Sequence, residues 1–306
     1  HRRARGFGRA RKRCGVGLSR LDTDSFRAPQ RERRQSSRWF ADRYLGRETQ
    51  FVRRRTQANH TYNFKNNRVM VHWLSSSPLR ASALRGLGSP QNTFANESFM
   101  DELAFATGAD PVEFRLRHLS DARARAVLEA VAKRADWSNR KSPQGASLKS
   151  GHGVAFVQYD RTEAYVAAVA EVEVNPENGE VRVQRVFVAH DCGLIINPDG
   201  LKNQIEGNVI QATSRTLKEE VQFDRSMVTS VDWTLYPILR FPEIPEVVIE
   251  LINRSDQPAV GAGEATTSAI PPAIANAIFD ATGVRLRTIP FTADRIKTAL
   301  LQSNLP

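Results

Sequence analysis

The stretch VGAGEATTSAIPPAIANAIF, residues 260–279, combines a glycine turn, one carboxylate and the start of an apolar helix. Gly261 and Gly263 permit backbone conformations that other residues avoid, and they let a ligand approach the main chain closely. Two prolines then suit the first turn of a helix, whose amides have no internal partner. Apolar residues recur at helical spacing as far as Gly283, which is well placed to cap the helix. The pattern predicts that Glu264 stands on a turn directly ahead of a buried helix.

Two interpretations of Glu264 are open. A solvated surface turn is the simpler one, because short motifs often match by chance. The helix that follows is nearly all apolar, however, and a buried helix draws the preceding turn inward. An inward carboxylate is costly unless it has a role. The free amides and positive dipole end of a helix start would also suit a phosphate or a developing oxyanion.

The positive charge of the chain is concentrated at one end. The 306 residues carry a formal net charge of +11. Residues 1–60 hold 18 Lys and Arg against 5 Asp and Glu, whereas the remaining residues hold 26 against 28. A segment this rich in arginine and poor in aliphatic residues cannot bury enough apolar surface to fold alone. We expect a basic segment of low order outside the fold, either a disordered extension or wrongly framed coding sequence. An arm that binds a polyanion is the alternative, although no nucleic acid partner is expected.

Cysteine usage and hydropathy exclude several classes of protein. Cys14 and Cys192 lie far apart and match no disulfide framework or metal-ligand spacing. An iron–sulfur cluster needs several cysteines, so any such cluster is expected on another chain. No apolar run approaches the length of a membrane span, and the arginine-rich start is no signal peptide. The location stays open between cytoplasm and periplasm. Because the sequence begins at His1, we expect the natural N-terminus to lie further upstream.

From residue 61 the composition becomes that of an ordered domain. We expect a first part at residues 61–137, a linker at 138–150 and a C-terminal part at 151–306. The linker is rich in Ser, Gly, Lys and Pro. In the first part, a helix that starts at Ser89 is predicted to bury an apolar face, and two shorter helices follow. That face would consist of Phe99, Leu103 and Ala106.

The C-terminal part mixes strand and helix patterns. Runs of β-branched residues predict strands at residues 153–159, 163–175, 180–189 and 247–252, with Asn178-Gly179 as a hairpin turn. Helical spacing predicts three helices. The first covers residues 199–221, the second follows Pro271 and Pro272, and the third starts at Thr292. The fold class is therefore predicted as α+β, with helices packed on a mixed or antiparallel sheet.

Three motifs together resemble a known family. They are RGLGSPQ at residues 85–91, NQIEG at 203–207 and GAGE at 261–264. They are similar to the C-terminal part of the molybdopterin-binding large subunit of the xanthine dehydrogenase/aldehyde oxidase family. The bacterial branch with isoquinoline oxidoreductase and nicotinate dehydrogenase is the most similar. The resemblance covers about residues 61–306 and implies the molybdopterin-binding-domain type of fold.

The resemblance also implies roles for individual residues. Glu264 would be the general base beside molybdenum, and Leu87 would contact the substrate where relatives have an aromatic residue. The remaining matched positions would bind the cofactor. They are Arg85, Gly86, Gln204, Gly261, Gly263, Thr266 and Thr267. No protein side chain is expected to ligate the metal, because the pterin carries it.

The implied activity is bacterial molybdenum hydroxylase chemistry on an aldehyde or an N-heterocycle, with water as the oxygen source. The implied cofactor is molybdenum–molybdopterin, with the cytosine dinucleotide form as an open option. Electrons would leave through a 2Fe-2S subunit, with an FAD or cytochrome subunit as a further option. A Gly-Gln-Gly cofactor motif and an upstream glutamine of the family are not found in this sequence. An inactive fragment or a scaffold subunit without its own catalysis is therefore the alternative.

Overall fold

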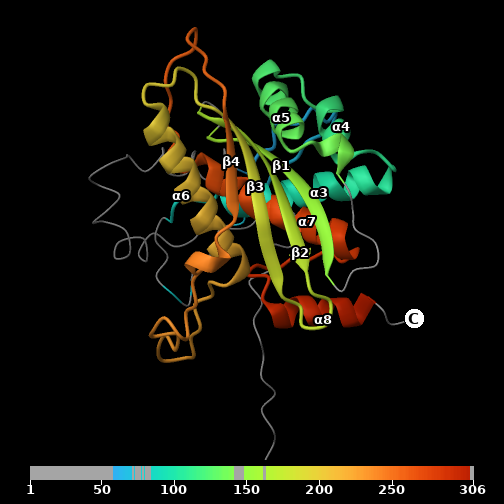
Figure 1. Ribbon diagram of the computed structural model, residues 1–306, viewed down its shortest axis with the longest axis vertical. Coiled ribbons are helices and arrows are strands. Elements are labelled where there is room, and N and C mark those ends of the chain that lie inside the picture. Colours follow the sequence, from blue (N-terminus) through green and yellow to red (C-terminus); the bar gives the residue numbers. More distant parts are fainter. Residues whose placement is uncertain are drawn as a thin grey trace, which may run out of the picture.

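Three consecutive strands rich in alanine and valine form the centre of the fold. The structure, a computed structural model, describes residues 58–70, 72, 77, 79, 84–140, 148–160 and 163–303. Within it, β1 (Lys149–Gln158), β2 (Tyr165–Val174) and β3 (Val181–Asp191) pair antiparallel, and β4 (Glu246–Leu251) joins β3 in parallel. The strand order is β1-β2-β3-β4, so the sheet is mixed, as predicted (Figure 1).

The predicted hairpin between β2 and β3 is confirmed. The two strands pair from Tyr165 opposite Asp191 to Val174 opposite Val181, with one irregularity between Glu171 and Val172. The turn reverses at Gly179, which has a φ of 79°, a conformation that favours glycine. The long antiparallel pairing fixes which side chains face each side of the sheet.

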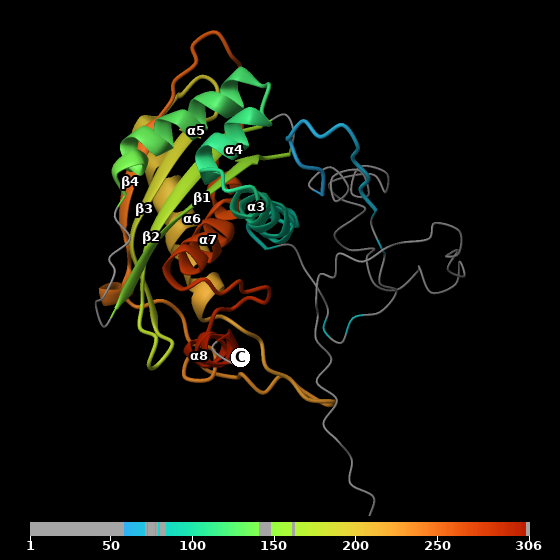
Figure 2. The same ribbon diagram turned by 90° about the vertical axis from the view of Figure 1, so that its right-hand side faces the viewer.

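Helices cover both faces of this sheet (Figure 2). On one face lie α6 (Pro198–Leu217) and α7 (Ile270–Thr282), and on the other lie α4 (Pro111–Arg117) and α5 (Ala122–Arg134). The long α3 (Ser89–Ala106) packs against α7 and the β1 edge, and α8 (Ala293–Ser303) lies at the hairpin end. The described residues thus form two apolar clusters, one on each side of the sheet.

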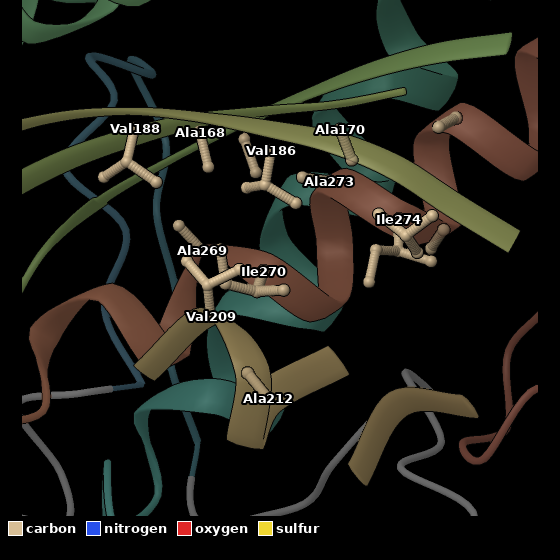
Figure 3. Packing of buried hydrophobic residues seen from close by; sticks show 14 of the residues in the cluster. Ala168, Ala170, Val186, Val188, Val209, Ala212, Ala269, Ile270, Ala273 and Ile274 are labelled. Atoms are coloured by element: carbon tan, nitrogen blue, oxygen red, sulfur yellow. The ribbon is translucent and has the colours of Figure 1, made fainter. Parts of the chain in front are cut away.

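Small residues let α7 approach the sheet very closely. A Cβ atom added at Gly153 would lie only 2.1 Å from the main-chain nitrogen of Ala277. Figure 3 shows Ala168, Ala170 and Val186 of the sheet pointing toward the start of α7. These three side chains are fully buried. Close packing of this kind fixes the position of α7, and with it the turn that precedes the helix.

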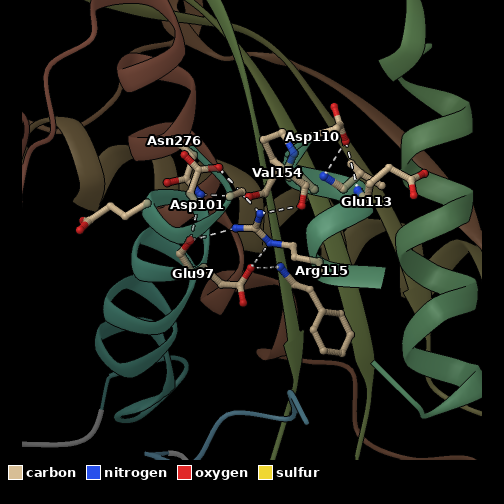
Figure 4. Close-up of polar contacts among 12 residues, drawn as sticks. Glu97, Asp101, Asp110, Glu113, Arg115, Val154 and Asn276 are labelled. Carbon is tan, nitrogen blue, oxygen red and sulfur yellow. Dashed lines mark hydrogen bonds and ion pairs between the residues drawn. The ribbon is translucent and has the colours of Figure 1, made fainter. Parts of the chain in front are cut away.

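The predicted apolar face of α3 is wrong. Phe99 is 49% exposed, and the buried side of the helix is largely polar. Figure 4 shows the reason, which is that Glu97 and Asp101 on this side meet the guanidinium of Arg115 from α4. Paired charges replace the apolar contacts that helical spacing predicted. The helix also begins with Ser89 as its first residue, and Gly88 is the N-cap.

Most other predicted boundaries shift by a few residues. The predicted helix at 199–221 ends earlier, since α6 ends at Leu217. The last helix buries Ile296 and Leu300, as its spacing predicts. Of the predicted linker, residues 141–147 lie outside the described part, and β1 already begins at Lys149. No helix in the described part of the chain has both the length and the apolar character that a membrane crossing requires.

Of the basic segment, residues 1–57 lie outside the described residues. The described chain that follows is anchored to the domain. The hydroxyl of the buried Tyr62 donates to Glu97 at 2.7 Å, and the amide of Asn63 donates to the carbonyl of His118 at 2.7 Å. Tyr62 and Asn63 therefore pack on α3 and on the end of α4.

Candidate active site

Three segments that lie far apart in the sequence meet beside α7. They are the turn at residues 84–88 ahead of α3, the middle of α6, and the glycine turn at 261–264. Each of them carries one of the three motifs described above. The order of the strands and helices therefore brings most of the predicted site residues together.

Glu264 is half-buried and both of its carboxylate oxygens are engaged. The main-chain amide of Gly86 donates to Oε2 at 2.8 Å, and the hydroxyl of Tyr159 donates to Oε1 at 2.7 Å. Each oxygen keeps a further lone pair for another donor. The carboxylate is therefore oriented by the protein and still able to accept a proton.

The helix does not begin directly after Glu264. A short 3-10 segment, η4 (Ala265–Ser268), separates the glutamate from α7, and Ala269 is the N-cap of α7. The first turn of α7 is buried, with Ile270, Pro271 and Pro272 inside the protein. The expectation that a free helix start faces a ligand here is thus wrong, because the four buried residues of η4 cover it.

Arg85 ties the three segments to one another. Its Nε donates to the carbonyl of Gly263 at 2.7 Å, and its Nη2 donates to Oε1 of Gln204 at 2.8 Å. Burial lowers the pKa of Arg85, the nearby Glu264 opposes this effect, and Arg215 adds to it. A Cβ added at Gly207 in α6 would lie 3.4 Å from Nη1 of Arg85, which is an ordinary van der Waals contact.

The turn that holds Gly86 and Leu87 has an unusual backbone. Gly86 has a φ of 93° and Leu87 a φ of 52°, a value that is uncommon for a residue with a side chain. Leu87 is 38% exposed. Non-glycine residues in this region often mark functional sites, where the surrounding structure maintains the strain.

Two polar residues of the site were not predicted from the sequence, and the first is Asn208. Nδ2 of this fully buried residue donates to the carbonyls of Gln204 at 2.6 Å and Gly263 at 3.1 Å. The hydroxyl of Thr267 donates to Oδ1 of Asn208. The only available signal was an asparagine four residues after Gln204, on the same side of a helix.

The second missed residue is Tyr159, at the end of β1. Its ring is buried in the apolar cluster under α7, and its hydroxyl bonds Glu264. Burial raises the pKa of Tyr159 well above its usual range, and the hydrogen bond to Glu264 raises it further. Nothing in the local sequence pairs a tyrosine at position 159 with a glutamate at 264, because only the fold brings them together.

Not every predicted residue joins this arrangement. Gly261 is exposed, and a Cβ there would lie 3.4 Å from Oε2 of Glu163 rather than beside Arg85. Thr266 is in η4, but its buried hydroxyl bonds no described residue. Hydrogen bonds connect the other predicted residues, apart from Leu87. They are Arg85, Gly86, Gln204, Gly263, Glu264 and Thr267.

The polar atoms of the site fit a large polar cofactor. Among the described residues, no cluster of three or more His, Cys, Asp or Glu side chains is able to hold a metal ion. Several buried polar atoms of α6 and η4 have no hydrogen-bond partner in the described protein. They are Oε1 of Gln211 and the hydroxyls of Thr213, Thr266 and Ser268. Buried polar atoms without partners are rare, and a bound pterin would supply partners to those that it reaches.

Comparisons with known proteins point to the same kind of cofactor. Two family models of the molybdopterin cofactor-binding domain match residues 97–245 and 46–119. A nicotinate dehydrogenase chain of Pseudomonas putida is 45% identical over 78% of this chain and 21% of its own length. The beta chain of isoquinoline 1-oxidoreductase from Brevundimonas diminuta is 38% identical over 68% of this chain and 26% of its own length.

Solved structures show the same fold at low sequence identity. Aldehyde oxidoreductase from Desulfovibrio gigas has a TM-score of 0.65 and 17% identity, over 73% of this chain and 42% of that chain.

This chain spans about a fifth to a quarter of the length of the two curated relatives named above. With two matching cofactor-binding domains, these relatives and this fold, the chain belongs to the molybdopterin-binding subunits of the xanthine dehydrogenase/aldehyde oxidase family.

Proposed function

We propose that this chain supplies the base-bearing part of a molybdenum hydroxylase, with Glu264 as the general base. The reaction would insert an oxygen atom from water into a C–H bond of an N-heterocycle or an aldehyde. The observation that carries the proposal is the convergence of three distant segments on one oriented carboxylate. The relatives named for nicotinate and isoquinoline support an N-heterocyclic substrate.

Each residue of the site would have a distinct role. Glu264 would accept the proton of the water-derived oxygen at one of its carboxylate oxygens. Gly86 would hold Oε2 of that carboxylate through its amide, and Arg85 would hold the glycine turn through the carbonyl of Gly263. Leu87, which is partly exposed beside this turn, would contact the substrate.

The cofactor would lie against the polar atoms of α6 and η4. Gln204, Thr266 and Thr267 would face it, with Gly261 and Gly263 leaving room for its approach. When bound, the molybdenum–molybdopterin cofactor supplies an acceptor for the two electrons of the oxidation. A partner chain with 2Fe-2S clusters, and an FAD or cytochrome subunit, would then take these electrons up. The cytosine dinucleotide form of the cofactor belongs to the same proposal.

A second candidate function is a scaffold or fragment without its own catalysis. The observation that favours it is the small share of the relatives' length that the chain spans. Molybdenum content separates the two candidates. A full chain that retains stoichiometric molybdenum after purification with an iron–sulfur partner supports the enzyme, and one that never binds molybdenum supports the scaffold.

The change Glu264→Gln tests the base directly. The amide keeps the shape of the side chain but removes the proton acceptor, so turnover should fall by about 10² to 10⁴. Molybdenum content should stay unchanged. The assay measures dye reduction by the loaded enzyme with nicotinate, isoquinoline or benzaldehyde as the substrate.

The matched control is Glu102→Gln. This carboxylate is partly exposed and pairs with Arg287, away from the site. The control should keep turnover within about twofold, because exposed ion pairs contribute little. Activity of Glu264→Gln within a few-fold of the parent, at equal molybdenum content, would remove Glu264 from the mechanism.

A further inference from the structure

Tyr159 donates a side-chain hydrogen bond to Glu264, and no motif of the sequence assigned it a role. We propose that Tyr159 is a positioning residue, which holds the carboxylate of Glu264 in one orientation through its hydroxyl. This proposal rests on the proposed function of Glu264 as the base. It concerns how that base is oriented, and not whether it is the base.

The hydroxyl of Tyr159 is dedicated to this contact. The residue is 3% exposed, and the bond to Oε1 of Glu264 at 2.7 Å is the hydroxyl's only hydrogen bond to a described residue. A phenol that donates to a carboxylate makes a charge-assisted bond, which is stronger than one between neutral groups. The tyrosine also stays protonated over the working pH range, because burial raises its pKa.

The main chain of Tyr159 is fixed by the turn that joins β1 to β2. Its amide donates to the carbonyl of Ala164 at 2.8 Å, and its carbonyl accepts from the amide of Glu163 at 3.2 Å. The ring packs in the apolar cluster with Val157 and Val166. The hydroxyl therefore has little freedom to follow Glu264 if the carboxylate rotates.

A buried hydrogen bond links the two elements that lead to the donors of Glu264. Glu97 of α3 accepts the amide of Phe156 in β1 at 3.0 Å and pairs with Arg115 at 2.8 Å (Figure 4). Tyr159 lies three residues beyond Phe156, directly after β1, and Gly86 lies in the turn that leads into α3. Because α3 and β1 are linked at Glu97, the amide and the hydroxyl that hold Glu264 keep a fixed separation.

This arrangement also suits a carboxylate that gains a proton. A tyrosine hydroxyl both donates and accepts hydrogen bonds. Tyr159 donates to Glu264 as an anion, and after rotation of its O–H it accepts from the protonated acid. The hydroxyl can thus accept a hydrogen bond from the protonated acid, which a protonated lysine or a main-chain amide, both donors only, cannot do.

The test compares Tyr159→Phe with Tyr165→Phe in the loaded enzyme. Tyr165 is the matched control, because it is also buried and its hydroxyl also donates to a carboxylate, that of Asp121 rather than Glu264, at 2.9 Å. Loss of a hydrogen bond to a charged group should lower the kcat of Tyr159→Phe by roughly 10- to 100-fold, with KM within about threefold. Tyr165→Phe should keep kcat within about twofold of the parent.

Crystal structures of the two variants give a readout that does not depend on activity. In Tyr159→Phe, Glu264 should occupy a second rotamer or show raised mobility, whereas in Tyr165→Phe it should keep its place. Incorporation of 3-fluorotyrosine at position 159 retains the hydroxyl and the ring packing, so it should keep kcat near that of the parent. This second variant keeps the test valid if Tyr159→Phe folds poorly.

The outcomes separate this proposal from the assignment of the base. If Glu264→Gln is inactive while Tyr159→Phe keeps full kcat and an unmoved Glu264, the base stands and the positioning role is overturned. If Tyr159→Phe and Tyr165→Phe lose the same activity together with molybdenum, a general structural role overturns the proposal. If Glu264→Gln is fully active, the proposed function itself fails.

Discussion

Gly86 provides a main-chain amide to Glu264 from a conformation that suits glycine alone. Its φ is 93°, and a Cβ atom there would lie 2.7 Å from Cγ of Pro90 in the first turn of α3. These contacts explain why glycine stands second in the Arg-Gly-Leu-Gly-Ser-Pro sequence. The glycine makes room for the proline that starts the helix, and its amide then points at the carboxylate.

We predict that Gly86→Ala disturbs both stability and turnover. The alanine must adopt a strained backbone and displace Pro90, which should cost about 1–3 kcal/mol of unfolding free energy. Gly108→Ala is the control, because Gly108 has a φ of 65° and no atom within 4 Å of an added Cβ. Urea unfolding and turnover are measured for both. Equal losses of turnover in the two variants would show that the amide of Gly86 does not matter to the site.

Leu87 allows a prediction about substrate choice. The resemblance to the family places an aromatic residue at this position, and a leucine offers no ring to stack on a flat substrate. Leu87→Phe should therefore shift the ratio of kcat/KM values toward isoquinoline and away from an aliphatic aldehyde. Leu84→Phe, at an exposed position of the same turn, should leave the ratio unchanged. An unchanged ratio in Leu87→Phe would mean that residue 87 does not contact the substrate.

At the scale of elements, α3 shows what periodicity fails to predict. Its buried side holds Glu97 and Asp101, and their partners are Arg115 on α4 and Arg285 beyond α7. Helical spacing gives the direction of each side chain but says nothing about a guanidinium that arrives from another element. Where the buried side of a helix is mainly apolar, as in α7 and α8, the same spacing predicts that side correctly.

We predict that Arg115→Met destabilises the domain strongly. Glu97 is 1% exposed, and the change leaves its carboxylate buried without its cation, which should cost about 3–5 kcal/mol. Arg287→Met is the control, because Arg287 is 68% exposed and its pair with Glu102 should contribute at most about 1 kcal/mol. Chemical unfolding measures the loss of unfolding free energy in both variants. A loss below about 1 kcal/mol in Arg115→Met would contradict the assignment of a structural ion pair.

At the scale of the whole molecule, the sequence predicted an α+β fold with a mixed or antiparallel sheet, and it named most of the residues that the structure brings together beside α7. Turn chemistry and alternation are local signals, and they were enough for the β2–β3 hairpin, whereas they left two interpretations of Glu264 open. Tyr159 and Asn208 were missed because their roles arise from contacts with residues that are distant in the sequence. The short η4 segment was missed because four small residues carry no period.

We predict that His190 makes the free energy of unfolding of the domain depend on pH. It is fully buried in β3, and neither ring nitrogen has a hydrogen-bond partner among the described residues. Burial lowers the pKa of His190 from 6.5 to about 4, and the neighbouring Asp191 only partly opposes this effect. Asp191 is itself engaged by the guanidinium groups of Arg123 and Arg254.

The sign of the pH dependence follows from proton binding. Between pH 6.5 and about 4, the unfolded chain carries a proton on His190 and the folded protein does not. Unfolding then takes up a proton, so the unfolding free energy falls as the pH is lowered through this window, by about 1.4 kcal/mol per pH unit at most. His190→Leu cannot bind this proton, and its unfolding free energy should fall less steeply between about pH 6.5 and 4.5. Urea unfolding at several pH values measures both slopes, and parallel slopes would mean that His190 titrates normally in the folded protein.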